Sequence, residues 1–171
     1  MREIGASVFL LFALAIVGAA SLVWAERVLP AKVASHFGAD GKPDGWMSRE
    51  SYVQAMGLIG FVAPAFLLGI GWSMRVVPGD MMNLPRREYW LSPARRHETN
   101  QYMARQFGWL ACLSLALIVA LNWLTIDANR ASPPRISDGV WVLLVVFLAS
   151  VAIWIVRLVW HFNRVPADRA V

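Results

Sequence analysis

The chain has 171 residues, of which 58% are hydrophobic and 16% are charged, and its formal net charge is +5. A soluble domain is usually about 45–50% apolar, so the composition excludes an ordinary soluble domain and indicates one small membrane domain. Nucleic-acid binding is not expected, because no binding motif accompanies the positive charge, and excess arginine in a membrane protein usually sets its orientation. The one cysteine, Cys112, excludes an intrachain disulfide and a two-cysteine metal site.

The hydrophobic residues gather in four blocks, and each reaches the length of about 20 residues that crosses a bilayer. These blocks predict an all-α fold, an integral membrane bundle of four transmembrane helices that forms a single domain over residues 1–171. A polar extracytoplasmic loop would follow the first span, and the third helix would have a cytoplasmic extension. The expected spans are residues 4–24, 52–74, 103–126 and 140–160, the outer loops are 25–51 and 127–139, and the inner loop is 75–102.

The first block must be compared with a secretory signal peptide, because Ala25 fits the small-residue rule for cleavage. Its apolar run, residues 4–24, is longer than the usual signal core of about 7–15 residues. Trp24 would also lie directly beside the cut. We therefore expect a retained membrane anchor.

A polar stretch, residues 29–46, separates the first two blocks and holds most of the side chains of the outer loop 25–51 that can support chemistry. Pro30 suits the first position of a helix, and Val33 and Phe37 lie one turn apart. We therefore expect a short helix from Pro30 to Phe37, ended by Gly38. Two Asp-Gly steps then predict turns, because glycine tolerates positive φ and aspartate bonds its own backbone.

The candidate residues of this stretch are those whose side chains can bind a ligand or hold the loop together: His36, Phe37, Asp40, Asp44 and Trp46. Imidazole and carboxylate groups bind divalent cations, so His36, Asp40 and Asp44 are candidate metal ligands. Their spacing matches no known metal signature, and Asp before Gly is ordinary in turns, so a structural role is the alternative. No cofactor is expected.

Two polar side chains are expected to organise the spans. Ser48 can cap the helix of the second span. Asn122 is the strongly polar side chain in the apolar part of the third span, and we expect it to bond to another helix. Such a bond is typically worth about 1 kcal/mol in lipid.

The second polar stretch precedes the third span. Residues 83–91 have no clean periodicity and are expected to form an ordered loop against the membrane surface. Ser92 and Pro93 are typical of a helix start, and nothing breaks the chain from there to Ile126, so one helix would begin outside the bilayer. The candidates for contact with a cytoplasmic partner or lipid headgroups are Asn83, Tyr89, Trp90, Arg95, Arg96 and Glu98.

Motifs of enzyme chemistry are lacking in the sequence. His97 and Glu98 begin like a zinc-protease motif, but Gln101 stands where the second histidine is required. There is also no phosphate-binding loop and no nucleophile elbow. We therefore expect a protein that is not an enzyme.

The distribution of Lys and Arg predicts the orientation in the membrane. If the amino terminus faces the cytoplasm, ten of these residues lie inside and six lie outside. The inner residues are Arg2, Arg75, Arg86, Arg87, Arg95, Arg96, Arg105, Arg157, Arg164 and Arg169, and the outer residues are Arg27, Lys32, Lys42, Arg49, Arg130 and Arg135. Both termini are therefore expected to be cytoplasmic.

Two stretches resemble the SdpI-like family of bacterial membrane proteins, which carry a domain of unknown function. The first stretch is Leu29-Pro30, His36-Phe37, Gly41 and Pro43-Asp44-Gly45-Trp46, and the second is Asn83-Leu84-Pro85, Tyr89-Trp90-Leu91, Arg95-Arg96 and Glu98-Thr99. The resemblance implies a multi-pass protein of the bacterial inner membrane. It also implies a role in toxin immunity and signalling, in which a secreted toxin is met outside and a regulator is held at the inner face. The two spans after the shared region differ from those of the family member with the immunity role. The resemblance therefore supports the membrane domain more strongly than it supports the immunity role.

The polar loop and the family resemblance together lead to one expected function and two alternatives. A non-enzymatic immunity or sensor-type protein would recognise an extracytoplasmic peptide or small ligand through residues 29–46 and meet a cytoplasmic regulator inside. The first alternative is a structural or accessory subunit of a membrane complex or transporter. The second is a metal-binding or enzymatic site at the outer loop. The lipid bilayer and a second copy of the chain are further expected partners.

Overall fold

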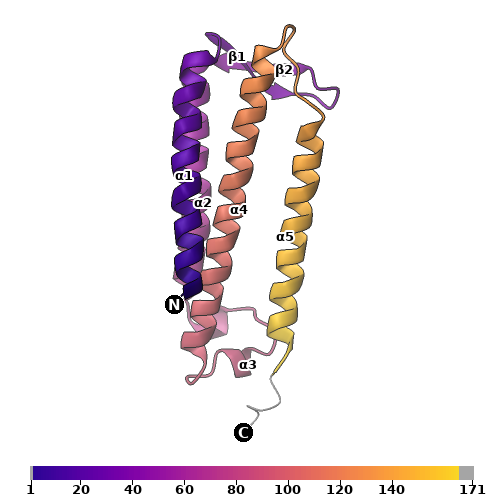
Figure 1. Ribbon diagram of the computed structural model, residues 1–171. Coiled ribbons are helices and arrows are strands. Elements are labelled where there is room, and N and C mark those ends of the chain that lie inside the picture. Colours follow the sequence, from indigo (N-terminus) through magenta and orange to yellow (C-terminus); the bar gives the residue numbers. More distant parts are fainter. Residues whose placement is uncertain (1, 166–171) are drawn as a thin grey trace.

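A computed structural model of the chain describes residues 2–165. The elements are α1 (Arg2–Val28), β1 (Lys32–Phe37), β2 (Pro43–Ser48), α2 (Arg49–Ser73), the 3-10 helix η1 (Gly79–Met81), α3 (Arg87–Trp90), α4 (Arg96–Arg130) and α5 (Gly139–Asn163). The four long helices run alongside one another, with the β1–β2 hairpin at one end and α3 at the other (Figure 1). Arg169, which the charge count assigns to the inner side, lies outside the described residues.

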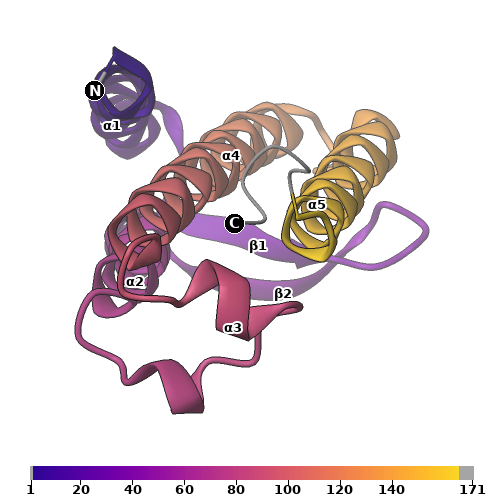
Figure 2. The ribbon, with the colours of Figure 1, turned by 90° about the horizontal axis from the view of Figure 1, so that it is seen from below.

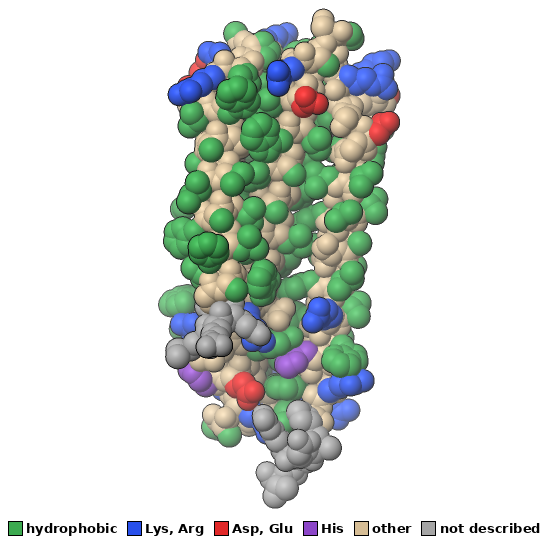
Figure 3. All heavy atoms as spheres, in the orientation of Figure 1, with side chains coloured by type: hydrophobic (Ala, Val, Ile, Leu, Met, Phe, Trp, Pro, Cys, Tyr) green, Lys and Arg blue, Asp and Glu red, His purple; other side chains and the backbone are tan. Residues whose placement is uncertain are grey.

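The four long helices are each long and apolar enough to cross a membrane. Hydrophobic side chains cover the middle of the face in Figure 3, and most charged side chains lie near its two ends. None of the most apolar part of α5 is buried inside the protein, so its surface requires a lipid environment. The structure therefore supports the prediction of a multi-pass membrane protein with four spans.

Helix α4 is the centre of the bundle. Figure 2 shows it between α1 and α2 on one side and α5 on the other. Glycines permit the close contacts, because a Cβ added at Gly71 would lie 3.0 Å from the Phe107 Cβ, and one added at Gly108 would lie 3.0 Å from the Ser7 Oγ. Helix α5 stands apart from this three-helix group.

Asn122 of α4 joins the three closely packed helices by hydrogen bonds. The Tyr52 hydroxyl of α2 donates to its Oδ1 at 2.8 Å, and its Nδ2 donates to the Ser21 Oγ of α1 at 2.9 Å. The Ser21 hydroxyl in turn donates to the Gly18 carbonyl. Asn122 is 2% exposed, and the oxygen and the nitrogen of its amide each have a hydrogen-bond partner inside the protein. The prediction that Asn122 bonds to another helix is confirmed.

The predicted helix from Pro30 to Phe37 is wrong, although the fold as a whole is mostly helical, as predicted. Residues 32–37 form the strand β1, which pairs antiparallel with β2. A free helix of eight residues is marginal in water, whereas the hairpin satisfies the backbone of both segments. It also buries Val33 completely, in a cluster with Leu29, Tyr52 and Ile126. Tertiary packing therefore overrides the helical spacing of Val33 and Phe37.

Of the helix starts predicted from local sequence, one is confirmed and one is wrong. Ser48 does cap α2, because its Oγ accepts from the Ser51 N–H at 3.1 Å. The predicted start at Ser92-Pro93 is wrong, since α4 begins at Arg96 and the Ser92 hydroxyl donates to the Tyr89 carbonyl instead. The rest of that prediction holds, because α4 is one unbroken helix from Arg96 to Arg130. The expected loop over residues 83–91 contains the short helix α3.

The Asn122 contacts yield a stability prediction. We expect Asn122→Leu to lower the free energy of unfolding by about 1–2 kcal/mol, because the Tyr52 and Ser21 hydroxyls lose a buried partner. Thermal unfolding of the purified protein in detergent measures this loss. The control is Ser73→Ala, whose hydroxyl donates to Ile70 within its own helix. Equal melting temperatures for the two variants would contradict the assignment.

Candidate functional site

The hairpin is regular near the membrane helices and irregular at its tip. Lys32 pairs with Ser48, and Ala34 with Trp46, but the register shifts on both sides of His36, which faces Gly45. Such irregularities bend a strand and redirect its side chains. The chain reverses over residues 38–42, where Gly41 has a φ of +78° that a side chain would strain. The turn predicted at Asp44-Gly45 is therefore wrong, because these residues belong to β2.

His36 and Asp44 form an exposed pair across the two strands. The His36 Nδ1 contacts the Asp44 Oδ1, and the two side chains are 75% and 55% exposed. Gly45 makes room for the imidazole, since a Cβ there would lie 2.8 Å from the His36 Cβ. Beside the pair, the Lys32 ammonium lies 5.4 Å from the centre of the Trp46 ring. The exposed face of the hairpin therefore presents both charge signs and an aromatic ring to solvent.

Asp40 has a different role from Asp44. Its carboxylate accepts from the Lys42 backbone N–H at 3.1 Å and pairs with the Lys42 ammonium at 3.3 Å. The backbone bond, helped by the ammonium group, holds the pKa of Asp40 below its ordinary 3.8. Among the described residues, no three His, Cys, Asp or Glu side chains are grouped so as to hold a metal ion. The candidate ligands His36, Asp40 and Asp44 thus divide into a pair and a turn residue.

The hairpin is tied to the helices and to the loop before α5. The Asn129 side chain of α4 accepts from the Ala34 N–H at 2.8 Å and donates to the Ala34 carbonyl at 2.9 Å, as a neighbouring strand would. The loop before α5 contributes two contacts, from the Ile136 N–H to the Gly41 carbonyl and from the Arg135 guanidinium to the Asp40 carbonyl. The hairpin therefore connects α4 with α5 at this end.

A pocket of about 330 Å³ lies beneath the hairpin, between α2, α4 and α5. Its lining is mostly apolar, with polar groups from the hairpin, α2 and α4. The lining residues are Ser35, His36, Phe37, Gly38, Tyr52, Met56, Ile59, Ile118, Leu121, Thr125, Ile136, Val140, Trp141 and Leu144. A concave apolar site with a few polar groups suits an amphipathic ligand. The sequence pointed to His36 and Phe37, but no local signal identified the lining residues of α4 and α5.

The predicted inner residues mainly brace the opposite end of the protein. Trp90 is 6% exposed, and its indole N–H donates to the Phe162 carbonyl of α5 at 2.9 Å. The Arg96 guanidinium donates to the Val77 carbonyl. Arg95 lies over the Tyr89 ring at 4.2 Å and also pairs with Glu98. Asn83 is exposed and stands apart from these contacts.

Part of the chain matches a known protein family. Residues 9–60 match a family described as a domain of unknown function (DUF1648). The match spans most of α1, the hairpin and the first half of α2, so it includes all the hairpin residues of the candidate site. Neither the curated proteins nor the solved structures contain a significant match. The comparison supports the expected domain of unknown function for this region.

The close approach at Gly45 is testable. We expect Gly45→Ala to displace His36, because the new Cβ would lie 2.8 Å from the His36 Cβ. Amide hydrogen exchange over residues 32–48 should become faster. Gly69→Ala is the matched control, since a Cβ at that position of α2 meets no described atom within 4 Å. Unchanged exchange in Gly45→Ala would show that the hairpin does not need this contact.

The lowered pKa of Asp40 predicts a pH dependence at the turn. A carboxyl group with a depressed folded-state pKa stabilises the fold above its ordinary pKa, and this stabilisation is lost as the pH falls through the folded value. The amide resonance of Lys42, followed by NMR, should therefore titrate with a midpoint below 3.8. Asp40→Asn should abolish the titration. A midpoint at or above the ordinary value would contradict the hydrogen bond.

Proposed function

We propose that this chain is a non-enzymatic membrane protein of the immunity or sensor type, which binds an amphipathic peptide or small ligand at the hairpin. The observation that carries the proposal is the pocket beneath the hairpin, with the exposed His36–Asp44 pair at its edge. The apolar lining would take an apolar side chain of the ligand. The exposed imidazole and carboxylate would exchange their mutual contact for polar groups of the ligand.

The orientation in the membrane belongs to the same proposal. We place the chain in the bacterial inner membrane, with both termini cytoplasmic and the hairpin outside. The positive-inside rule supports this, because the end of the bundle that holds α3 carries both Arg-Arg pairs, at residues 86–87 and 95–96. The resemblance of residues 29–46 to the SdpI-like family supports the immunity or sensor role.

Helix α4 is the proposed route from the pocket to the inner face. It contributes Thr125 to the pocket and continues without a break to Arg96 at the other end. Its 35 residues span roughly 50 Å at about 1.5 Å per residue. A cytoplasmic regulator would meet the exposed polar groups near α3, and a second copy of the chain is a further proposed partner.

The alternative function is a structural or accessory subunit, in which the hairpin only braces the spans. The bonds from Asn129 to Ala34 and from Arg135 to Asp40 favour it, because they join the hairpin to both neighbouring segments. A metal site at the hairpin is less supported, since the described residues contain no three-ligand cluster, and an enzymatic site there stays the remaining alternative.

The test is protection of a bacterial host against a panel of synthetic membrane-active amphipathic peptides. We expect the wild-type chain to raise the inhibitory concentration of at least one peptide severalfold. His36→Ala and Trp46→Ala should abolish this protection while insertion and melting temperature stay unchanged, because truncating exposed side chains usually changes stability by no more than about 0.5 kcal/mol. His97→Ala, an exposed histidine at the opposite end, is the matched control.

Two outcomes would contradict the sensor proposal. One is the absence of protection by the wild-type chain across the panel. The other is full protection by both hairpin variants. If His36→Ala and Trp46→Ala instead lower the melting temperature as much as Asn129→Ala, the bracing function is favoured.

A further inference from the structure

A second opening lies between α4 and α5, near the end of the bundle that holds α3. It has a volume of about 990 Å³, at the upper end of the usual range of about 300–1,000 Å³ for ligand pockets. Figure 3 shows openings between α5 and the neighbouring helices. The residues that line it are Tyr102, Arg105, Gln106, Trp109, Leu110, Leu113, Ser150, Ile153, Trp154, Val156, Arg157, Trp160 and His161. We refer to it as the α4–α5 groove.

Two arginines face the groove at the same level of the bundle. Arg105 comes from α4 and Arg157 from the antiparallel α5. Two contacts between the helices flank this level: His161 stacks on Tyr102 at 3.8 Å on one side of it, and the Trp154 indole donates to the Gln106 carbonyl at 3.3 Å on the other. No aspartate or glutamate is among the described residues that line the groove.

Arg105 and Arg157 both contribute guanidinium groups to the lining of the groove, so this part of the groove favours an anion over a cation. Guanidinium groups match phosphate oxygens in a planar, two-pronged geometry, so a phosphate monoanion or diester suits the position. Arg105 already lies 5.3 Å from the centre of the Tyr102 ring, which helps to hold its guanidinium on the groove side.

The rest of the groove is suited to acyl chains. Leu110, Leu113 and Ile153 continue it from the arginine level toward the middle of the spans. Trp109 and Trp160 line it with indoles that are 39% and 56% exposed, as is typical of the membrane interface. An anionic headgroup site followed by an apolar channel matches one class of molecule in shape and charge.

We propose that the α4–α5 groove binds an anionic phospholipid, with its phosphate between Arg105 and Arg157 and an acyl chain along the apolar part. Basic pockets between transmembrane helices are known to hold such headgroups. The lipid would fill the space that α5 leaves beside α4. This site is separate from the hairpin pocket and does not depend on the proposed sensor function.

The test is native mass spectrometry of the full chain in detergent, with phosphatidylglycerol compared with phosphatidylcholine of the same acyl chains. We expect wild-type protein to retain phosphatidylglycerol in preference, on the order of tenfold, because the choline ammonium of phosphatidylcholine offsets the charge of its phosphate, and the two arginines therefore favour the net-negative lipid. Arg105→Gln/Arg157→Gln should abolish the preference. The matched control, Arg86→Gln/Arg87→Gln, removes the same charge at exposed positions near α3 and should keep the preference.

Several outcomes would overturn the proposal. These are equal retention of the two lipids by wild-type protein, an unchanged preference in the groove variant, or an equal loss in the control. Displacement of the lipid by millimolar inorganic phosphate would instead indicate a site for a soluble anion. If the double variant fails to fold, Arg157→Gln alone decides the matter, because Arg157 is exposed, and it should lower the preference severalfold.

Discussion

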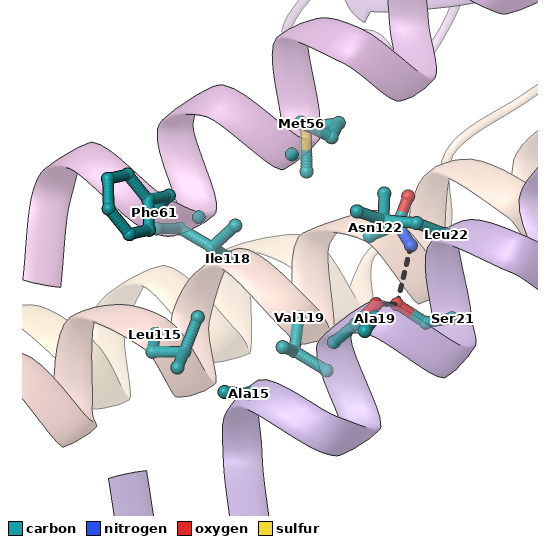
Figure 4. A pocket seen from close by; sticks show the side chains of 13 residues that line it. Ala15, Ala19, Ser21, Leu22, Met56, Phe61, Leu115, Ile118, Val119 and Asn122 are labelled. Carbon is teal, nitrogen blue, oxygen red and sulfur yellow. Dashed lines mark hydrogen bonds between the residues drawn. The ribbon is translucent and has the colours of Figure 1, made fainter. Parts of the chain in front are cut away.

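The need to satisfy polar groups inside a bilayer governs this fold, and Asn122 is where it is met most fully. Its amide accepts from Tyr52 of α2 and donates to Ser21 of α1, so one side chain of α4 fixes the relative positions of three helices. In lipid, apolar surfaces have no strong tendency to associate, and hydrogen bonds and close packing decide which helices meet. A cavity of about 280 Å³ lies beside this network, lined by small and apolar residues of the same three helices (Figure 4). The hydrogen bonds therefore hold together three helices whose packing leaves a cavity between them.

Helix α5 obeys a different constraint. Within its described residues, it has no buried polar side chain that bonds to two helices as Asn122 does, and apart from the Trp154–Gln106 hydrogen bond it is held at its two ends. At the hairpin end, the loop before it bonds to the backbone of Gly41 and Asp40. At the other end, Trp90 donates to the Phe162 carbonyl and His161 stacks on Tyr102. The two openings along α5, beneath the hairpin and between the arginines, follow from this arrangement.

The hairpin contains two groups of residues that its composition alone does not separate. Asp40 and Lys42 form the turn, and Asn129 pairs with Ala34 as an additional strand would. His36, Asp44 and Trp46 are exposed, so the fold does not require their side chains for packing. Exposed side chains of this kind beside a mostly apolar pocket support the proposal that the hairpin recognises a ligand, whereas the contacts beneath it join the hairpin to the helices.

The amino-acid sequence by itself determined the four spans, the unbroken α4, the Ser48 cap and the polar role of Asn122. These features depend on hydrophobic length and on local chemistry, which can be read along the chain. Only the tertiary structure decided that residues 32–37 form a strand, because their partners are β2 and Asn129, and the latter is 95 residues away from Ala34. It likewise decided that Trp90 is buried and that both pockets exist, since each pocket is lined by helices that are distant in the sequence. The spacing of residues along one segment favours a local conformation for that segment. The free energy of strand pairing and burial depends on other segments of the chain, which are distant in the sequence.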